Sequence, residues 1–257
     1  MNLIKYNIKN RVATITLNRP DKRNALNSAM VKELYSTLKK AEYNNDVKVI
    51  ILKANGDAFC AGADLAYLKE LSQYTYAENL ADSMQLKEMF RQIYTMKKIV
   101  IAQIEGSAIA GGAGLATVCD LVFSVPEAKF GFTEVKIGFV PAIVSVFAIR
   151  KFGESHTKRL LLSGDLIEAK EARKIGLVNF ISTKELIDEE VEKFAYNLVT
   201  KTSGNSLALT KSLISEIQQK DLEQALNYAA ELNAKARDST DCKKGINAFL
   251  NKEKIVW

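Results

Sequence analysis

The sequence predicts an α/β protein with a helical C-terminal third. Apolar runs at residues 47–54 and 99–104 have the composition of buried strands, and they alternate with segments of helical periodicity as far as residue 125. Five amphipathic segments with charged outer faces then follow one another from residue 168 to residue 251. Because no repeat or linker divides the chain, we expect a core over residues 1–200 that continues directly into a helical region over residues 201–257.

Local patterns predict the individual elements. Residues 2–18 alternate in polarity like a strand hairpin with a turn at residues 9–11, and Asn27 is placed to cap a helix that runs to Tyr43. Residues 55–65 have the composition of a loop, and residues 110–114 that of a glycine turn before a short buried helix beginning at Leu115. The other expected helices are residues 65–71, 79–96, 140–149, 168–175, 184–200, 205–218, 221–237 and 240–251.

Composition excludes several classes of protein. The chain has 257 residues, 47% of them hydrophobic and 26% charged, which is enough for a full core, and it has no run of 18 apolar residues. Its start lacks the apolar core of a secretion signal, so we expect a cytoplasmic protein. Cys60, Cys119 and Cys242 lie far apart and His156 is the only histidine, which argues against a disulfide framework and against a zinc site.

The charge balance leaves two interpretations open. A formal charge of +6 and a pI near 9.0 suit an anionic partner, either a phosphate-bearing small molecule or a nucleic acid. Lys and Arg are spread along the chain rather than grouped, so solubility alone explains the charge equally well.

The most informative stretch is residues 105–138. Its glycine turn would let backbone N–H groups come close to a ligand. Glu134 follows in an apolar and aromatic segment, where poor solvation raises the pKa of a carboxyl and makes it a candidate for proton transfer. A second small-residue loop, residues 58–65, also follows an apolar strand. N–H groups from two such loops can form an oxyanion hole, in which each donor contributes about 3 kcal/mol to transition-state stabilisation.

Other common catalytic motifs are absent from the sequence. It contains no GxGxxG after a strand, no GxxxxGK[ST], no HExxH and no GxSxG. His156 lies in a charged helix start, so we expect it at the surface rather than in a nucleophilic triad.

Residues 58–65 and 106–112 closely resemble the two oxyanion-hole segments of the crotonase (enoyl-CoA hydratase/isomerase) family. The resemblance covers nearly the whole chain. It extends to residues 15–20, 24–27, 119–120, 130–131, 176–178 and 248–252.

The resemblance implies a crotonase-like spiral of repeated strand–strand–helix units with a helical C-terminal region that assembles trimers or dimers of trimers. It also implies an acyl-coenzyme A substrate, with no metal and no separate cofactor, since coenzyme A is part of the substrate. By position, the carbonyl-binding N–H groups belong to Ala63 and Gly111, and the catalytic carboxylate is that of Glu134. The positions that match coenzyme A contacts are Arg23, Ala25, Ala61, Asp64, Leu65 and Ala66, together with Phe249 and Lys252 from a neighbouring subunit.

One position departs from the pattern of related hydratases, which commonly carry a second glutamate where this chain has Gly114. A single carboxylate can still move a proton from water to carbon, and it equally suits a 1,3-proton shift. The sequence therefore predicts an enoyl-CoA hydratase that adds water across the α,β double bond, with enoyl-CoA (Δ3-Δ2) isomerase as the alternative. Gly114→Glu should then recreate a two-glutamate site.

Two finer hypotheses complete the prediction. The sequence of residues 110–115, 134–138 and 141–142 is most similar to that of bacterial members that act on methylglutaconyl-CoA and related substrates. This similarity suggests a role in branched-chain amino acid degradation or, more broadly, in fatty acid metabolism. RNA binding without this catalysis is motivated by the basic pI and by RNA-binding relatives, but no RRM or KH motif is present. We therefore expect an acyl-CoA partner, no membrane and no nucleic acid.

Overall fold

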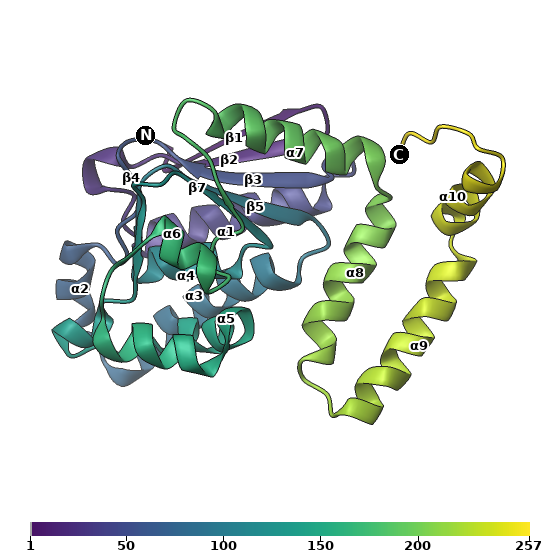
Figure 1. Cartoon of the computed structure of the whole chain (residues 1–257). Helices are drawn as coiled ribbons and strands as arrows, with labels where there is room; N and C mark the ends of the chain where they lie inside the picture. The colour runs from purple at the N-terminus through teal and green to yellow at the C-terminus, as the bar shows by residue number, and fades with distance from the viewer. Residues whose placement is uncertain (1) are drawn as a thin grey trace.

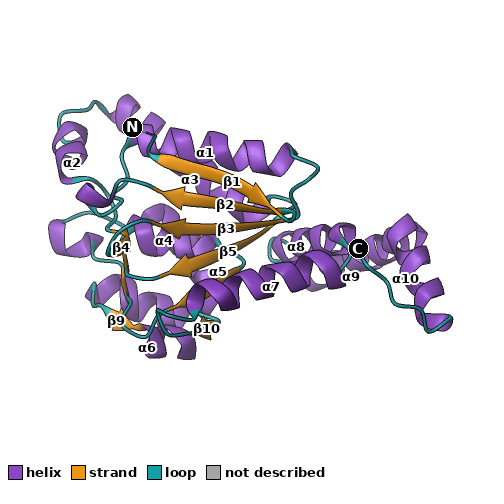
Figure 2. Cartoon of the chain, turned by 90° about the horizontal axis from the view of Figure 1, so that it is seen from above, coloured by secondary structure: helices purple, strands orange, loops and turns teal. Residues whose placement is uncertain are grey.

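Two β-sheets organise the computed structural model, which describes residues 2–257 (Figures 1 and 2). The six-stranded sheet has the order β1 (Ile4–Lys9), β2 (Val12–Leu17), β3 (Val49–Ala54), β5 (Ile99–Ile104), β7 (Leu121–Ser124), β10 (Phe180–Ile181). Within it only the β1–β2 pair is antiparallel. The four-stranded sheet has the order β4 (Ala58–Cys60), β6 (Ser107–Ile109), β8 (Lys129–Gly131), β9 (Ile167–Glu168), and in it only the β8–β9 pair is antiparallel.

Helices separate successive strand pairs. The ten α-helices are α1 (Ser28–Tyr43), α2 (Leu65–Leu71), α3 (Tyr76–Thr95), α4 (Gly111–Val118), α5 (Ala142–Ser163), α6 (Ala169–Lys174), α7 (Ile187–Lys201), α8 (Gly204–Ile217), α9 (Leu222–Asp238) and α10 (Thr240–Leu250), and two 3-10 turns are η1 (Pro20–Lys22) and η2 (Glu134–Ile137). The order β3-β4-α2, β5-β6-α4, β7-β8-α5 repeats one strand–strand–helix unit, so the predicted spiral is confirmed.

The core lies around the larger sheet. Figure 1 shows α7 over one face of this sheet and α1, α3 and α4 on the other. All six residues of β5 are buried, as expected for a central parallel strand. In α4, every residue from Gly112 to Val118 is buried. The small residues of the glycine stretch thus allow a helix to pass through the interior, close to β4 and β6.

Local signals account for several element boundaries. Asn10 and Arg11 both have positive φ (51° and 64°), the geometry of a tight hairpin turn between β1 and β2. The side chain of Asn27 accepts a hydrogen bond from Met30 N at 2.9 Å and caps α1, as predicted.

One sequence-based expectation is wrong and one sheet was missed. The glycine stretch is the first turn of α4, which begins at Gly111 rather than at Leu115, because packing between the sheets outweighs the low helix propensity of glycine. The four-stranded sheet was not expected, since strands of two or three residues are too short to show periodicity. The apolar run before and within α5 is only partly buried, with Val140 65% and Val146 48% exposed.

The C-terminal helices extend away from the sheets. Figures 1 and 2 show α8 leaving the end of α7 and α9 returning beside it, with α10 beyond. No helix within residues 2–257 has the length and apolar character needed to cross a membrane.

Candidate active site

The two small-residue loops meet where β4 and β6 end. These strands are parallel neighbours, so the chain leaves both at the same edge of the smaller sheet. Gly62 has φ +90°, and a Cβ there would lie 2.9 Å from Ala110 Cβ and 3.6 Å from Gly111 N. Gly62 is therefore required both by its backbone conformation and by the contact with the second loop.

Two backbone N–H groups at this junction have no acceptor within the described residues. Gly111 is the first residue of α4, so its N–H lies before the first helical hydrogen bond, which Gly114 N donates to Ala110 O at 2.9 Å. On the facing loop, Leu26 N donates to Gly62 O at 2.6 Å and Asp64 N donates to Leu26 O at 2.8 Å, while Ala63 N between them is uncommitted. The predicted pair of donors is thus brought together.

Ala110, between β6 and α4, has a strained backbone conformation. As the N-cap of α4 it has φ 49° and ψ −120°, a region that a residue with a Cβ rarely occupies, at a cost of about 1–3 kcal/mol. The backbone N–H of Ala110 donates to Gly131 O at 2.7 Å, which ties the strained turn to β8. The sequence analysis did not single out Ala110, because alanine in a glycine-rich segment shows no outward sign of positive φ.

Glu134 lies beside the same junction. It follows β8, which pairs with β6 through Ile109 and Gly131, so it leaves the sheet next to the glycine loop. The residue is 9% exposed and its Oε2 has no hydrogen-bond partner. Burial raises the pKa of the carboxyl, and the backbone N–H of Glu134 opposes this only in part. These are the properties of a general acid–base group.

The turn before α1 is fastened to the first loop. The buried Asn24 side chain donates from Nδ2 to Asn55 O and Ala58 O, both at 2.8 Å, and Ala61 N donates to Arg23 O at 3.0 Å. Three predicted coenzyme A positions, Arg23, Ala25 and Ala61, therefore lie close to Ala63. Arg23 itself is exposed and has a positive φ of 49°.

Asp64 has a structural role that the sequence analysis did not anticipate. Its carboxylate caps α2 by accepting from Ala66 N at 2.8 Å, and it pairs with Arg19 Nη1 at 2.6 Å. Burial would raise the pKa of Asp64, but the hydrogen bonds from Arg19, Tyr67 and Ala66 outweigh it and lower the pKa. Arg19 was missed because no local pattern connects it to Asp64. Leu65, which is 84% exposed, and Ala66 remain open to a ligand.

Two predicted residues are not brought to the junction within one chain. Phe249 lies near the end of α10 and is 83% exposed, and Lys252 follows α10. Figure 1 places α10 at the opposite end of the molecule from α2.

The space beside Gly114 is occupied. A Cβ at this position would lie 2.5 Å from Val144 Cγ2 and 3.0 Å from Phe90 Cε2. A glutamate at position 114 would have to displace the side chains of Val144 and Phe90, so we now expect that Gly114→Glu does not recreate a two-glutamate site.

The remaining reactive side chains lie outside this chemistry. Burial raises the pKa of Cys60 and of Cys119 to about 12, so neither thiol is a nucleophile near neutral pH. His156 is exposed on α5, as predicted.

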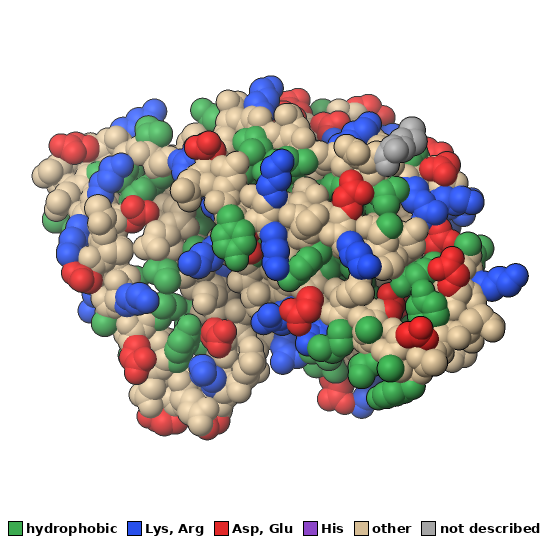
Figure 3. Space-filling model, turned by 180° about the vertical axis from the view of Figure 1, so that it is seen from behind, with side chains coloured by type: hydrophobic (Ala, Val, Ile, Leu, Met, Phe, Trp, Pro, Cys, Tyr) green, Lys and Arg blue, Asp and Glu red, His purple; other side chains and the backbone are tan. Residues whose placement is uncertain are grey.

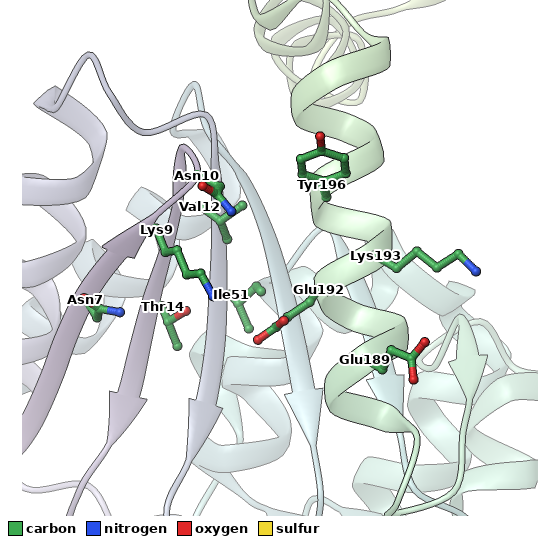
Figure 4. Close-up of a pocket in the computed structure, with 10 residues that line it drawn as sticks. All are labelled: Asn7, Lys9, Asn10, Val12, Thr14, Ile51, Glu189, Glu192, Lys193 and Tyr196. Atoms are coloured by element: carbon green, nitrogen blue, oxygen red, sulfur yellow. The ribbon is translucent and has the colours of Figure 1, made fainter.

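Two cavities lie away from the junction. The larger, about 520 Å³, lies between the outer side of β1–β3 and α7, where Lys9 and Glu192 extend toward one another (Figure 4). The second, about 360 Å³, lies between the core and α8. None of the predicted site residues lines either one.

Known proteins share this architecture over nearly the whole chain. A family model described as enoyl-CoA hydratase/isomerase matches residues 7–257. The chain is 43% identical to a Thermus thermophilus protein named provisionally as an enoyl-CoA hydratase, covering 95% of this chain and 96% of that protein. It is 34% identical to a crotonyl-CoA hydratase of Syntrophomonas wolfei, covering 95% and 93%. A crystal structure of an enoyl-CoA hydratase from Shewanella pealeana superposes with a TM-score of 0.94 at 28% identity, covering 99% and 96%. The chain is thus an enzyme of the enoyl-CoA hydratase/isomerase family, with the crotonase fold.

Proposed function

We propose that this protein hydrates the α,β double bond of an enoyl-CoA thioester. The observation that carries the proposal is the buried, unpartnered carboxylate of Glu134 beside two uncommitted N–H groups, those of Ala63 and Gly111. The thioester oxygen would accept hydrogen bonds from both donors, which stabilise the enolate. Glu134 takes a proton from water as the oxygen bonds to the β-carbon, and it then returns that proton to the α-carbon.

Binding of the coenzyme A arm is the second part of the proposal. The coenzyme A arm would lie along the turn before α1 and the loop before α2, where it would contact Arg23, Ala25, Ala61, Leu65 and Ala66. The Asp64 carboxylate fixes that loop by capping α2 and by pairing with Arg19. Phe249 and Lys252 would reach the nucleotide from a neighbouring subunit, because α10 lies far from the junction in its own chain. We therefore propose a trimer or a dimer of trimers built through the helical region over residues 201–257. The reaction needs no separate cofactor, and we place the enzyme in the cytoplasm.

Enoyl-CoA isomerase is the second candidate, and the wall beside Gly114 favours it. A 1,3-proton shift needs one base and no bound water, and Val144 and Phe90 exclude a second carboxylate that could hold water. Incubation with a 2-enoyl and a 3-enoyl thioester of equal chain length separates the two reactions. Rapid hydration of the 2-enoyl ester supports the hydratase, whereas conversion of the 3-enoyl ester without hydration supports the isomerase. Glu134→Gln serves as the inactive control in both assays.

The acyl group is a finer proposal. The sequence of the segments around Gly111 and Glu134 favours a branched-chain substrate such as methylglutaconyl-CoA. Related proteins are named for different acyl groups, among them a 2,3-dehydroadipyl-CoA hydratase of Escherichia coli, 31% identical to this chain. Comparing kcat/KM over crotonyl-, methylglutaconyl- and longer enoyl-CoA esters tests the choice, and a preference for a straight-chain ester would contradict it.

RNA binding stays the least favoured alternative. Figure 3 shows the face opposite to the one in Figure 1, and there cationic and anionic side chains are interspersed rather than gathered into one basic surface. Electrostatic binding is strongest at low salt, so an RNA pulldown at low ionic strength tests the prediction that no nucleic acid is bound.

A further inference from the structure

The cavity of about 360 Å³ between the core and α8 has the form of a small-molecule site. Its size is within the range of about 300–1,000 Å³ typical of such sites. It lies at the C-terminal end of α4, whereas Gly111 of the oxyanion hole begins that helix, so it is separate from the active site. Much of its wall is apolar, formed by Ile99, Val118, Leu121, Leu198, Leu207 and Ile214.

Three cationic side chains from two helices also line this cavity, together with one carboxylate. Lys211, which is 7% exposed, uses all three ammonium protons within the protein: its Nζ donates to Ile93 O at 2.8 Å, to Lys98 O at 3.0 Å and to Asp120 Oδ2 at 2.7 Å. Asp120 is thereby committed to Lys211 and to Val100 N, which donates to the same Oδ2 at 2.7 Å. This pair needs no further ligand.

The other two cations keep donors free. Lys151 Nζ makes one hydrogen bond in the described chain, to Cys119 O at 2.6 Å, and Arg150 makes one, from Nη1 to Val146 O at 3.0 Å. Among the described residues neither forms a direct ion pair, and Arg150 is exposed. Burial is the main cause that lowers the pKa of Lys151; the Cys119 thiol and the Asp120 carboxylate oppose this effect, and the Lys211 ammonium adds to it. Because Asp120 is already hydrogen-bonded to Lys211, the free donors of Lys151 and Arg150 make this part of the cavity suited to an anion.

We propose that this cavity binds a small organic anion with an apolar body, of the class of short-chain carboxylates. The carboxylate would accept hydrogen bonds from Lys151 Nζ and from the Arg150 guanidinium. The chain of the ligand would lie against Leu198, Leu207 and Ile214, which bury apolar surface on binding. Inorganic phosphate would contact only the cations and a neutral alcohol only the apolar wall, so each would make part of the contacts of the carboxylate ligand.

Calorimetric titration of the full-length protein with sodium hexanoate tests the proposal. We expect saturable binding, and binding at least about tenfold weaker for inorganic phosphate and for 1-hexanol. The variant Arg150→Gln/Lys151→Met should weaken hexanoate binding at least about tenfold, because it removes both free donors. Lys158→Gln, which removes a cation of the same helix that is already paired with Glu154, should leave binding unchanged.

A second variant tests the cavity without touching its charges. Thr210 lies exposed on α8 at the wall of the cavity, so Thr210→Trp should fill it and abolish hexanoate binding. Asn205→Trp, on an exposed position of α8 outside the cavity, is the matched control. Because α8 belongs to the helical region proposed to build the oligomer, circular dichroism and gel filtration of each variant establish that it is folded and assembled like the wild type. The proposal is overturned by absence of saturable binding, by equal affinity in wild type and the two cavity variants, or by competition between hexanoate and coenzyme A.

Discussion

At the residue scale, the proposed chemistry depends on one buried carboxylate. Glu134 is buried, its Oε2 is unpartnered, and burial raises its pKa. Such a group is poorly stabilised when charged, which makes it a stronger proton acceptor than a solvated glutamate. The same property has consequences for activity and for stability, and they can be measured separately.

For activity, Glu134→Gln keeps the shape of the side chain and removes its ability to accept a proton. We expect kcat to fall by about two to four orders of magnitude, the range for a positioned proton-transfer group, with little change in KM. In the wild type, kcat/KM should decrease as the pH falls through the raised pKa, above the ordinary value of 4.5. Near-normal turnover in the variant would show that another residue carries the proton.

For stability, the sign follows from the direction of the shift. A carboxyl whose pKa is higher in the folded state than in the unfolded state favours folding while protonated, and this contribution is lost as the pH rises through the folded pKa. At neutral pH we therefore expect Glu134→Gln to be more stable than the wild type, by about 1 kcal/mol, because it removes a buried unpaired charge. The difference should disappear in acid. Urea denaturation at several pH values measures it, and a less stable variant at neutral pH would contradict the assignment.

Gly114 provides a second prediction at this scale. A side chain here would collide with Val144 and Phe90, so Gly114→Glu should destabilise the protein by about 1–3 kcal/mol and should not increase hydration. Gly114→Glu/Val144→Ala removes the nearest contact and should recover part of that stability. Thermal unfolding compares the stability of both variants with that of the wild type. A Gly114→Glu protein as stable as the wild type would show that Val144 and Phe90 can move to accommodate the new side chain.

At the element scale, α8 is attached to the core by a buried lysine rather than by a broad apolar face. Lys211 and Ser215 are its buried residues, and Lys211 joins the end of α3, the start of β5 and Asp120. Lys48 acts similarly at the junction of α7 and α8, where its Nζ donates to Val199 O at 2.8 Å and to Thr202 O. Both lysines supply donors to carbonyl oxygens that would otherwise be buried without a partner.

Lys211→Met tests this attachment. Methionine preserves the apolar stem but leaves the Asp120 carboxylate without its cation, so we expect a loss of about 3–5 kcal/mol. Lys158→Met, which breaks an exposed pair with Glu154, should have a much smaller effect, because solvent screens such a pair. Urea titration gives both values. Equal effects of the two substitutions would mean that Lys211 contributes no more than a surface pair.

At the scale of the whole molecule, the position of the C-terminal helices bears on the proposal that each site is shared between chains. Arg23 lies on the turn beside the junction of the two small-residue loops, and Lys252 lies beyond α10 at the other end of the molecule. If both hold the phosphates of coenzyme A, Arg23→Gln and Lys252→Gln should each raise KM with little change in kcat, because distant phosphate contacts stabilise ground and transition states alike. Lys22→Gln, an exposed cation of the same turn, is the control.

Mixed oligomers test the sharing directly. When Arg23→Gln and Lys252→Gln chains are unfolded, mixed and refolded together, some sites should combine an intact Arg23 from one chain with an intact Lys252 from another. We expect a fraction of sites with wild-type KM to appear only in the refolded mixture. Kinetics equal to the average of the two variants would indicate that both residues act within one chain.

The sequence by itself determined the α/β class and most long elements, because helical periodicity, apolar strands and caps such as Asn27 are local signals. The repeated spiral followed from the resemblance to the crotonase family rather than from any local pattern. The sequence also pointed to Glu134 as an acid in an apolar segment and to two small-residue loops, and the family resemblance selected Ala63 and Gly111 within those loops. The start of α3 at Tyr76 was placed too late, although the capping box of Thr75 and Glu78 was present in the sequence.

Only the tertiary structure decided the features that depend on distant neighbours. The short strands of the smaller sheet form because pairing with neighbouring strands satisfies their backbone. Glycines occupy positions 112 and 114 of α4 because Cys60 of β4, and Val144 and Phe90 of α5 and α3, lie too close for a larger side chain. The ion pair of Arg19 with Asp64 and the apolar wall beside Gly114 bring together residues that are remote in sequence. The strain at Ala110 is a backbone geometry that its residue type does not reveal. Such contacts follow from packing of the whole chain, so no local pattern could have predicted them.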